Sequence, residues 1–391
     1  MPRVGYERSV PKSLPLRTLT TLGLALFGCQ SKPLRPIAAE TGGGAGEMAA
    51  AAGEATGGAP DGVPPGVRQR VLDDARISSD QAADDFQHAA AEIDFGSEPV
   101  ARAALYFDLR SPCFPFSNWA KLGVPSGQRW PEPCDAFDRT VQVTLDEPEN
   151  TSDGIGLELL RAITPFGGPE HLEADVTNVV NGLPGKHRLV VHIDTWSDAA
   201  GLVSGAKGEW YASVTLETWA GAAPRRVLAV LPVVFEAQTE PDSAPVTFEA
   251  PSGAGSALLE YRATGHGGVN VFNASCRGPA EEFCRRDHEL LLDGEVLAQL
   301  EPWRDDCDAL CTVTQNDGNS GPQSYCAENP CGDQNSVRAP RANWCPGSAT
   351  PPFVIEHAAL AQAGKHELLR SIPELEPGGK WTVSATYFAF E

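Results

Sequence analysis

The stretch "EPCDAFDRTVQVTL", Glu132 to Leu145, contains the pattern that points to the fold class. In its second half Val141, Val143 and Leu145 alternate with polar residues, which predicts a β-strand with one face on a core and the other in water. Its first half places a cysteine, two aspartates and an arginine around a phenylalanine, directly before the strand. Acids and a cysteine at the start of a strand are the first candidate for a functional site.

Similar strand-like segments follow one another from about residue 77 to the C-terminus, and 39 Gly and 33 Pro among 391 residues provide turns. The pattern predicts an all-β protein. The polar, proline-bearing stretch "AQTEPDSAP", residues 237–245, predicts a boundary between two β-sandwiches, over residues 69–238 and 239–391. Residues 305–345 are rich in cysteine and poor in hydrophobic pattern, which predicts a disulfide-stapled loop in the second domain.

The N-terminal segment has the features of an export signal. Four basic residues precede a short apolar run, Thr18–Phe27, which is too short to span a bilayer, so residues 1–28 are predicted to be a signal peptide. The run ends in "LALFGCQ", which resembles the bacterial lipobox and predicts lipidation of Cys29. The Gly/Ala-rich residues 29–68 would then be a flexible tether. We expect a protein of the bacterial cell envelope, lipid-anchored at the outer membrane or cell surface, or secreted.

The formal charge is −22, and loss of residues 1–28, with four basic residues and one acidic residue, moves it to about −25. This balance argues against nucleic acid as a partner, because phosphate binding depends on Lys and Arg. A neutral ligand such as a glycan is compatible with it. Ten cysteines in an exported chain favour disulfides over metal thiolates. If Cys29 carries lipid, nine cysteines remain, and one must stay free unless a partner or modification takes it.

Four stretches combine acids, aromatic residues and cysteines: "CDAFDR" (134–139), "HIDTW" (192–196), "GHGG…CRGPAEEFC" (265–284) and "RANWCPG" (341–347). Together, and in this order, they resemble the bacterial peptide:N-glycosidase F family from about residue 90 to the C-terminus. The resemblance implies two side-by-side eight-stranded jelly rolls with an active site in the groove at their interface. It also implies hydrolysis of the amide between asparagine and the first N-acetylglucosamine of N-linked glycans, without a cofactor or metal, with N-glycosylated proteins or glycopeptides as substrates.

The resemblance also implies roles for three acids. The family's essential aspartate falls on Asp138, as the principal catalytic acid/base, and its glutamate before an aromatic residue and a cysteine falls on Glu282, which would position water and polarise the amide. The third acid falls on Asp194, where the family has glutamate, and would orient the first sugar. Paired carboxylates in different protonation states can carry the proton transfers that amide hydrolysis needs.

Two other acids compete for these roles. Glu217 stands in a second acid-Thr-Trp motif, but the order of motifs favours Asp194, and Glu217 is expected to be a solvated acid on a strand face. Glu281 is adjacent to Glu282, and its register relative to Phe283 and Cys284 favours Glu282.

Arginine and tryptophan residues near the acids complete the expected site. Arg139 and Arg341 are expected to set carboxylate charge and donate to sugar or amide oxygens, and Trp196 and Trp344 to offer ring faces to sugars. His266 is expected to be structural.

The resemblance implies disulfides Cys113–Cys134 and Cys276–Cys284 around the two acid motifs, and a third between Cys307 and Cys345. Cys311–Cys326 would then close an inserted loop, leaving Cys331 unpaired.

Two alternative functions remain open. One is a glycan-binding lipoprotein without catalysis on the same fold. The other is a copper-dependent monooxygenase-like protein, since that class shares the tandem jelly-roll architecture. Against copper, the only methionine after the predicted signal peptide is Met48, in the tether, and the sequence has no His-x-His.

Overall fold

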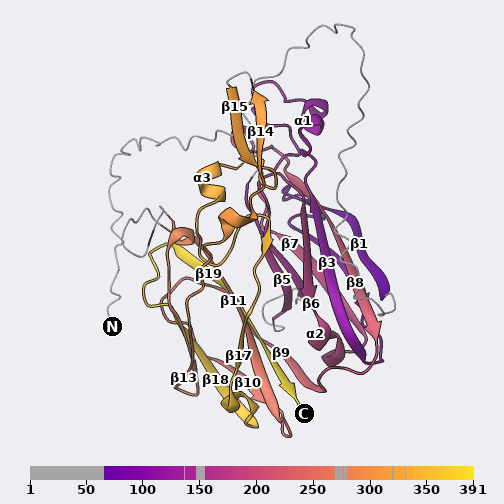
Figure 1. The fold of residues 1–391 in the computed structure, drawn as a ribbon, viewed down its shortest axis with the longest axis vertical. Helices are drawn as coiled ribbons and strands as arrows, with labels where there is room; N and C mark the ends of the chain where they lie inside the picture. Colours follow the sequence, from indigo (N-terminus) through magenta and orange to yellow (C-terminus); the bar gives the residue numbers. More distant parts are fainter. Residues whose placement is uncertain are drawn as a thin grey trace, which may run out of the picture.

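The computed structural model describes residues 66–135, 137–146, 155–268, 276, 280–318, 321–330 and 332–391 (Figure 1). The predicted signal peptide, Cys29, tether residues 29–65 and Cys331 lie outside the described residues. The described chain consists of antiparallel strands joined by loops and short helices, which confirms the predicted all-β class. None of its helices is long and apolar enough to cross a bilayer.

The first sandwich packs two sheets, with strand orders β1-β8-β3-β6 and β16-β5-β4-β7-β2. A jelly roll has this arrangement, with strands in the order 1-8-3-6 in one sheet and 5-4-7-2 in the sheet that faces it. The short β16 is contributed by the C-terminal part of the chain, and it pairs with β5. The strands are β1 (Val67–Ser78), β2 (His88–Asp94), β3 (Val100–Arg110), β4 (Thr140–Leu145), β5 (Leu157–Ile163), β6 (Glu170–Asp175), β7 (Lys186–Ile193), β8 (Glu209–Ala220) and β16 (Ser348–Ala349).

The second sandwich repeats this order, with sheets β17-β11-β19-β9 and β10-β18-β12-β13. The sequence places strand β9 at the end of the first domain, but β9 lies in the second sandwich, where it pairs with β19, so the boundary falls before Val227 and not after Gln238. A separate hairpin, β14-β15, belongs to the cysteine-rich segment. The strands are β9 (Val227–Gln238), β10 (Val246–Ala250), β11 (Ser256–Gly267), β12 (His288–Leu292), β13 (Glu295–Leu300), β14 (Val313–Gly318), β15 (Gly321–Cys326), β17 (Phe353–Glu356), β18 (Gly364–Ser371) and β19 (Gly379–Phe390).

Short helical segments lie in the connections. Figure 1 shows α1 and the β14-β15 hairpin at the same end of the molecule. These segments are α1 (Phe116–Leu122), α2 (Thr177–Gly182), α3 (Gln334–Val337), and the 3-10 turns η2 (Glu281–Phe283), η3 (Cys307–Leu310) and η4 (Ala358–Ala361).

Strand β4 follows the alternation predicted for it, but its second face is partly covered by protein. Val141, Val143 and Leu145 are fully buried in the first core, as expected. On the other face Thr144 is also buried, and Gln142 hydrogen-bonds Glu158 of β5 at 3.2 Å. The expectation of a solvated face is therefore wrong, because β5 on the same sheet packs against strands of the second sandwich.

A buried polar network joins the two sandwiches through β5. Arg161 and Glu158 form a two-point ion pair, 2.8 and 2.9 Å, with both side chains fully buried. Arg161 also donates to the backbone oxygen of Thr382, and Glu158 accepts from the hydroxyl of Ser384 in β19. Since each buried charge has hydrogen-bond partners from both sandwiches, this network fixes how β5 and β19 lie against each other.

Candidate active site

Asp135 is the centre of a buried hydrogen-bond cluster just before β4. Its carboxylate accepts from Nε and Nη2 of Arg139, at 2.7 and 2.8 Å. It also accepts from the Thr195 hydroxyl at 2.6 Å and from the Trp210 indole at 3.3 Å. A buried carboxylate needs such partners because water no longer solvates it. Asp135 therefore ties the segment before β4 to the segment after β7. The sequence analysis missed this role, for which the one signal is the adjacent half-cystine.

Arg139 is engaged with the protein rather than exposed to a ligand. Besides its ion pair with Asp135, its guanidinium lies over the rings of Phe137 and Trp196, 5.0 and 4.8 Å from their centroids. Its side chain is 7% exposed. This corrects the expectation that Arg139 donates to substrate: the residue supports the Asp135 cluster and the ring of Trp196.

Thr164 holds the backbone on both sides of Asp138. The Thr164 hydroxyl accepts from the N–H of Arg139 at 2.8 Å and donates to the C=O of Phe137 at 3.1 Å. The N–H of Thr164 donates to the C=O of Arg139 at 2.8 Å. Since Thr164 is fully buried just after β5, the position of Asp138 is fixed by a neighbouring strand end.

Asp138 is half-buried, and its surroundings act on its charge in opposite directions. Burial raises the pKa of the Asp138 carboxyl above its usual range, and the negative charge of Asp135 adds to the rise. The positive charges of Arg341 and Arg139 oppose it. Arg341 belongs to the C-terminal part of the chain, so the second sandwich takes part in setting the protonation of this acid.

Glu282 lies in η2, directly before a disulfide between Cys276 and Cys284. Its side chain is 25% exposed, and burial raises its pKa to about 7. Arg341 opposes this rise, and the negative charge of Asp138 adds to it. Asp138 and Glu282 come from different sandwiches, and each is close enough to the same arginine to be affected by it. These two sequence-predicted acids are therefore brought into one site.

The adjacent Glu281 has a different environment. Its buried carboxylate pairs with Arg286 at 2.7 and 3.1 Å and accepts from the Trp381 indole at 3.0 Å. Of the two neighbouring glutamates, Glu282 is thus the one that faces Arg341, as its register predicted.

Arg341 is fully buried between two aromatic rings. Its guanidinium lies 4.8 Å from the ring centroid of Phe283 and 4.3 Å from that of Trp344. Nη2 donates to the backbone oxygen and the hydroxyl of Ser336, at 2.7 and 2.8 Å, and Nη1 lies 3.5 Å from Glu282. Nε and Nη1 have no hydrogen-bond partner among the described residues. Arg341 therefore brings a cation with unused donors to the two acids.

Trp344 supports Arg341 and is not available to a ligand. Its side chain is 1% exposed, its indole N–H donates to the backbone oxygen of Gly265 at 3.0 Å, and His266 stacks on its ring. This corrects the expectation that Trp344 presents a face to a sugar, because packing within the second sandwich covers it. His266 itself hydrogen-bonds Thr264 at 3.0 Å, and burial lowers its pKa to about 3, so it stays neutral.

Asp194 and Trp196 lie at the exposed edge of the site. The N–H of Asp194 donates to the backbone oxygen of Thr140 at 3.1 Å, which places this segment beside the start of β4. The Asp194 carboxylate is exposed and lies 3.4 Å from Nε2 of Gln87. Trp196 is 42% exposed, and its contact with a sugar stays a prediction. Among the described residues, the Asp194 carboxylate makes no contact with Asp138 or Glu282.

Glu217, the rival of Asp194, is a mostly buried residue of β8 that pairs with Arg68 at 2.9 Å. The expectation of a solvated acid is therefore wrong for Glu217. Its ion pair with Arg68 of β1 gives it a structural role.

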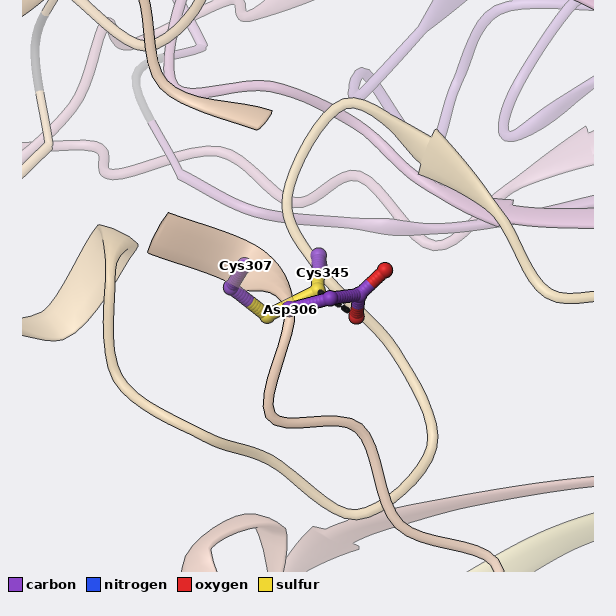
Figure 2. A group of neighbouring side chains, drawn as sticks. All are labelled: Asp306, Cys307 and Cys345. Atoms are coloured by element: carbon purple, nitrogen blue, oxygen red, sulfur yellow. Dashed lines mark hydrogen bonds between the residues drawn. A yellow bond between two sulfur atoms is a disulfide. The ribbon is translucent and has the colours of Figure 1, made fainter. Parts of the chain in front are cut away.

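The structure contains the four predicted disulfides, Cys113–Cys134, Cys276–Cys284, Cys307–Cys345 and Cys311–Cys326. One group of potential metal ligands occurs among the described residues, formed by Asp306, Cys307 and Cys345 (Figure 2). Figure 2 shows the two sulfurs of this group bonded to each other. A disulfide sulfur is not a thiolate ligand, so this group is a staple and not a metal site.

Comparison with known proteins finds a matching family model and solved structures with a similar fold. Residues 235–388 match the family model described as peptide-N-glycosidase F, C terminal. A solved structure of PNGase F, a glycosylasparaginase from Flavobacterium meningosepticum, is 19% identical, with a TM-score of 0.59 over 83% of this chain and 96% of that one. A structure of PNGF-II is 18% identical, with a TM-score of 0.60 over 83% of this chain and 66% of that one. No curated protein matches the sequence. The shared fold confirms the predicted jelly-roll architecture, while the groove expected between the sandwiches stays a prediction.

Proposed function

We propose that the chain, whose residues 235–388 match the C-terminal model of the peptide:N-glycosidase F family, is a glycoamidase of that family acting on N-glycosylated proteins or glycopeptides. The bond cleaved is the amide between the asparagine side chain and the first N-acetylglucosamine. The observation that supports this proposal best is the pair of acids, Asp138 and Glu282, from two sandwiches around the buried Arg341.

The chemistry of the reaction assigns a task to each group. Water adds to the amide carbon, the carbon–nitrogen bond breaks, and the products are an aspartate side chain and a glycosylamine. One carboxylate must take a proton from the water, and one carboxylic acid must give a proton to the leaving nitrogen. Burial raises the pKa of both acids, and for Glu282, with a pKa of about 7, both forms are accessible near neutral pH. We assign the acid/base role to Asp138 and the positioning of water to Glu282.

Arg341 and the exposed edge of the site complete the assignment. Arg341 is fully buried, so its positive charge can stabilise negative charge developing on the amide oxygen without a direct hydrogen bond to the substrate. The exposed ring of Trp196 and the carboxylate of Asp194 are placed to contact the first sugar. The same exposed ring favours the second candidate function, a glycan-binding protein without catalysis.

The test is release of glycan from a denatured glycopeptide in heavy-oxygen water, followed by mass spectrometry. A glycoamidase converts the glycosylated asparagine to aspartate with one heavy oxygen, with or without chelator. Asp287→Asn, an exposed acid near Glu282, is the matched control and should keep full activity. Binding without conversion would support the glycan-binding alternative. Turnover that requires added copper would support the monooxygenase-like one.

We also propose that the protein is exported and anchored through lipid on Cys29, because "LALFGCQ" follows a basic and apolar segment. A Cys29→Ala variant should lose labelling by a fatty-acid probe and leave the membrane fraction. Equal labelling of both proteins would contradict the anchor.

A further inference from the structure

Arg341 pairs with its glutamate less closely than three other buried arginines pair with their acids. Arg139, Arg161 and Arg286 each make two contacts of 2.7 to 3.1 Å with a single carboxylate. Arg341 stays 3.5 Å from Glu282, although it is fully buried and two of its nitrogens have no hydrogen-bond partner among the described residues. A charge-assisted hydrogen bond would be about 2.7–2.9 Å long. Something therefore holds the guanidinium back from Glu282.

Ser336 is the residue that holds Arg341 from the other side. Both its backbone oxygen and its hydroxyl accept from Nη2, at 2.7 and 2.8 Å, which occupies both protons of that nitrogen. Ser336 lies in α3, where the side chain of Asp333 accepts from the N–H groups of Asn335 and Ser336. The oxygens of Ser336 are thus fixed from outside the site.

Ser336, like Arg341, belongs to the cysteine-rich segment, residues 305–345. This segment is closed by Cys307–Cys345 and Cys311–Cys326. It is also joined to the first sandwich, because the N–H of Phe166 donates to the side chain of Asn329 at 3.0 Å. A segment so braced provides a fixed point for Arg341.

We propose that Ser336 is a positioning residue that holds the Arg341 guanidinium short of a close ion pair with Glu282 and so leaves this carboxyl free to position water. The contact itself does not depend on the proposed glycoamidase function. Its catalytic consequence does rest on that function.

The charged groups around the pair allow a simple test. Glu282, in η2, faces Arg341 and also Asp138, which lies in the segment before β4. Asp138 in turn faces Arg139 and Asp135. His266 of β11 faces Arg341 and Lys380 but stays neutral near neutral pH. Glu281 is occupied by Arg286. Asp138 and Glu282 are therefore the acids whose titration should respond to Arg341.

The experiment measures the titration of Glu282 by carboxyl-carbon NMR in protein labelled at glutamate, with Glu282→Gln to assign the signal. In Ser336→Ala the guanidinium loses one restraint and can turn towards Glu282. We expect the pKa of Glu282 to fall by about half a unit or more, because a closer cation favours the carboxylate. Ser336→Thr keeps the hydroxyl and should match the wild type. Asn335→Ala, an exposed neighbour in α3, is the matched control and should also match.

An unchanged or raised pKa of Glu282 in Ser336→Ala would overturn the proposal, as would an equal fall in Asn335→Ala. Circular dichroism checks that each variant is folded. In a glycan-release assay, the limb of the kcat profile governed by Glu282 should move to lower pH by the same amount, with KM changed less than about twofold. If the wild type releases no glycan, the glycoamidase function fails while the NMR titration still decides the role of Ser336.

Discussion

Thr164 and Asp138 are linked through the backbone: one buried threonine hydroxyl bridges the peptide groups before and after the aspartate. We predict that Thr164→Val, which keeps the shape of the side chain, leaves the N–H of Arg139 buried without this partner and destabilises the protein by about 1–3 kcal/mol. Because Asp138 loses its fixed position, kcat should fall about tenfold or more. Urea unfolding and single-turnover release measure the two effects. Thr140→Val, at the more exposed start of β4, should change neither. Wild-type kcat in Thr164→Val would contradict the positioning role.

Asp138→Asn should abolish glycan release while leaving glycan binding nearly intact. The substitution is almost isosteric, yet an amide does not transfer a proton at neutral pH, and such a role is worth about two to four powers of ten in rate. Asp194→Asn should instead weaken apparent affinity along with rate, because Asp194 is exposed at the edge of the site. Single-turnover release and a separate binding titration distinguish the two. An Asp138→Asn protein with more than about a tenth of the wild-type rate would show that another group carries the proton.

Two tryptophans should respond in opposite ways to replacement by alanine. Trp196 is 42% exposed, so Trp196→Ala should raise KM about threefold to tenfold and leave stability nearly unchanged. Trp344 is buried against Arg341 and His266, so Trp344→Ala should destabilise the protein by about 3–5 kcal/mol. Thermal unfolding and initial rates with a glycopeptide series test both. A stable Trp344→Ala protein with only a raised KM would restore Trp344 as a sugar contact.

The raised pKa of Glu282 predicts a pH dependence of stability. The usual pKa of a glutamate is 4.5, and that of Glu282 in the native state is about 7. Between pH 4.5 and about 7 the native state therefore binds this proton more tightly than the unfolded chain does. The contribution is therefore fully present below about pH 4.5 and is lost as the pH rises through 7, with a slope of at most about 1.4 kcal/mol per pH unit. Glu282→Gln should lack this slope in urea unfolding between pH 4.5 and 8. Parallel curves for both proteins would mean that Glu282 is not desolvated in solution.

Glu170, at the start of β6, should show the same sign of effect outside the site. It is 2% exposed, neither oxygen has a hydrogen-bond partner among the described residues, and burial raises its pKa well above the usual range. Glu170→Gln should thus be more stable than the wild type at pH 8, and the difference should shrink towards pH 4.5. Its glycan release should be unchanged. A difference that does not vary with pH would show that Glu170 stays hydrated.

The sequence was sufficient for features that depend on local pattern. Alternation of apolar and polar residues predicts strands because successive side chains on a strand point to opposite faces. The resemblance of the ordered motifs to a known family pointed to Asp138 and Glu282, and register relative to Phe283 and Cys284 favoured Glu282 over Glu281. The same resemblance implied the disulfides next to both acids, which the structure contains.

What a side chain faces was decided only by the tertiary structure. Asp135 and Asp138 stand three residues apart in "CDAFD", and the local sequence does not indicate which of them is buried. Asp135 is the buried one, because Thr195 and Trp210 from other segments donate hydrogen bonds to it. Trp344 lies in the motif "RANWCPG" and was expected to contact a sugar, but His266 stacks on its ring and Gly265 accepts its indole N–H. Thr164 and Ser336 carry no motif and act through hydrogen bonds to distant residues. Burial and partners come from chain segments far apart in sequence, and they set the charge, the exposure and the position of each group.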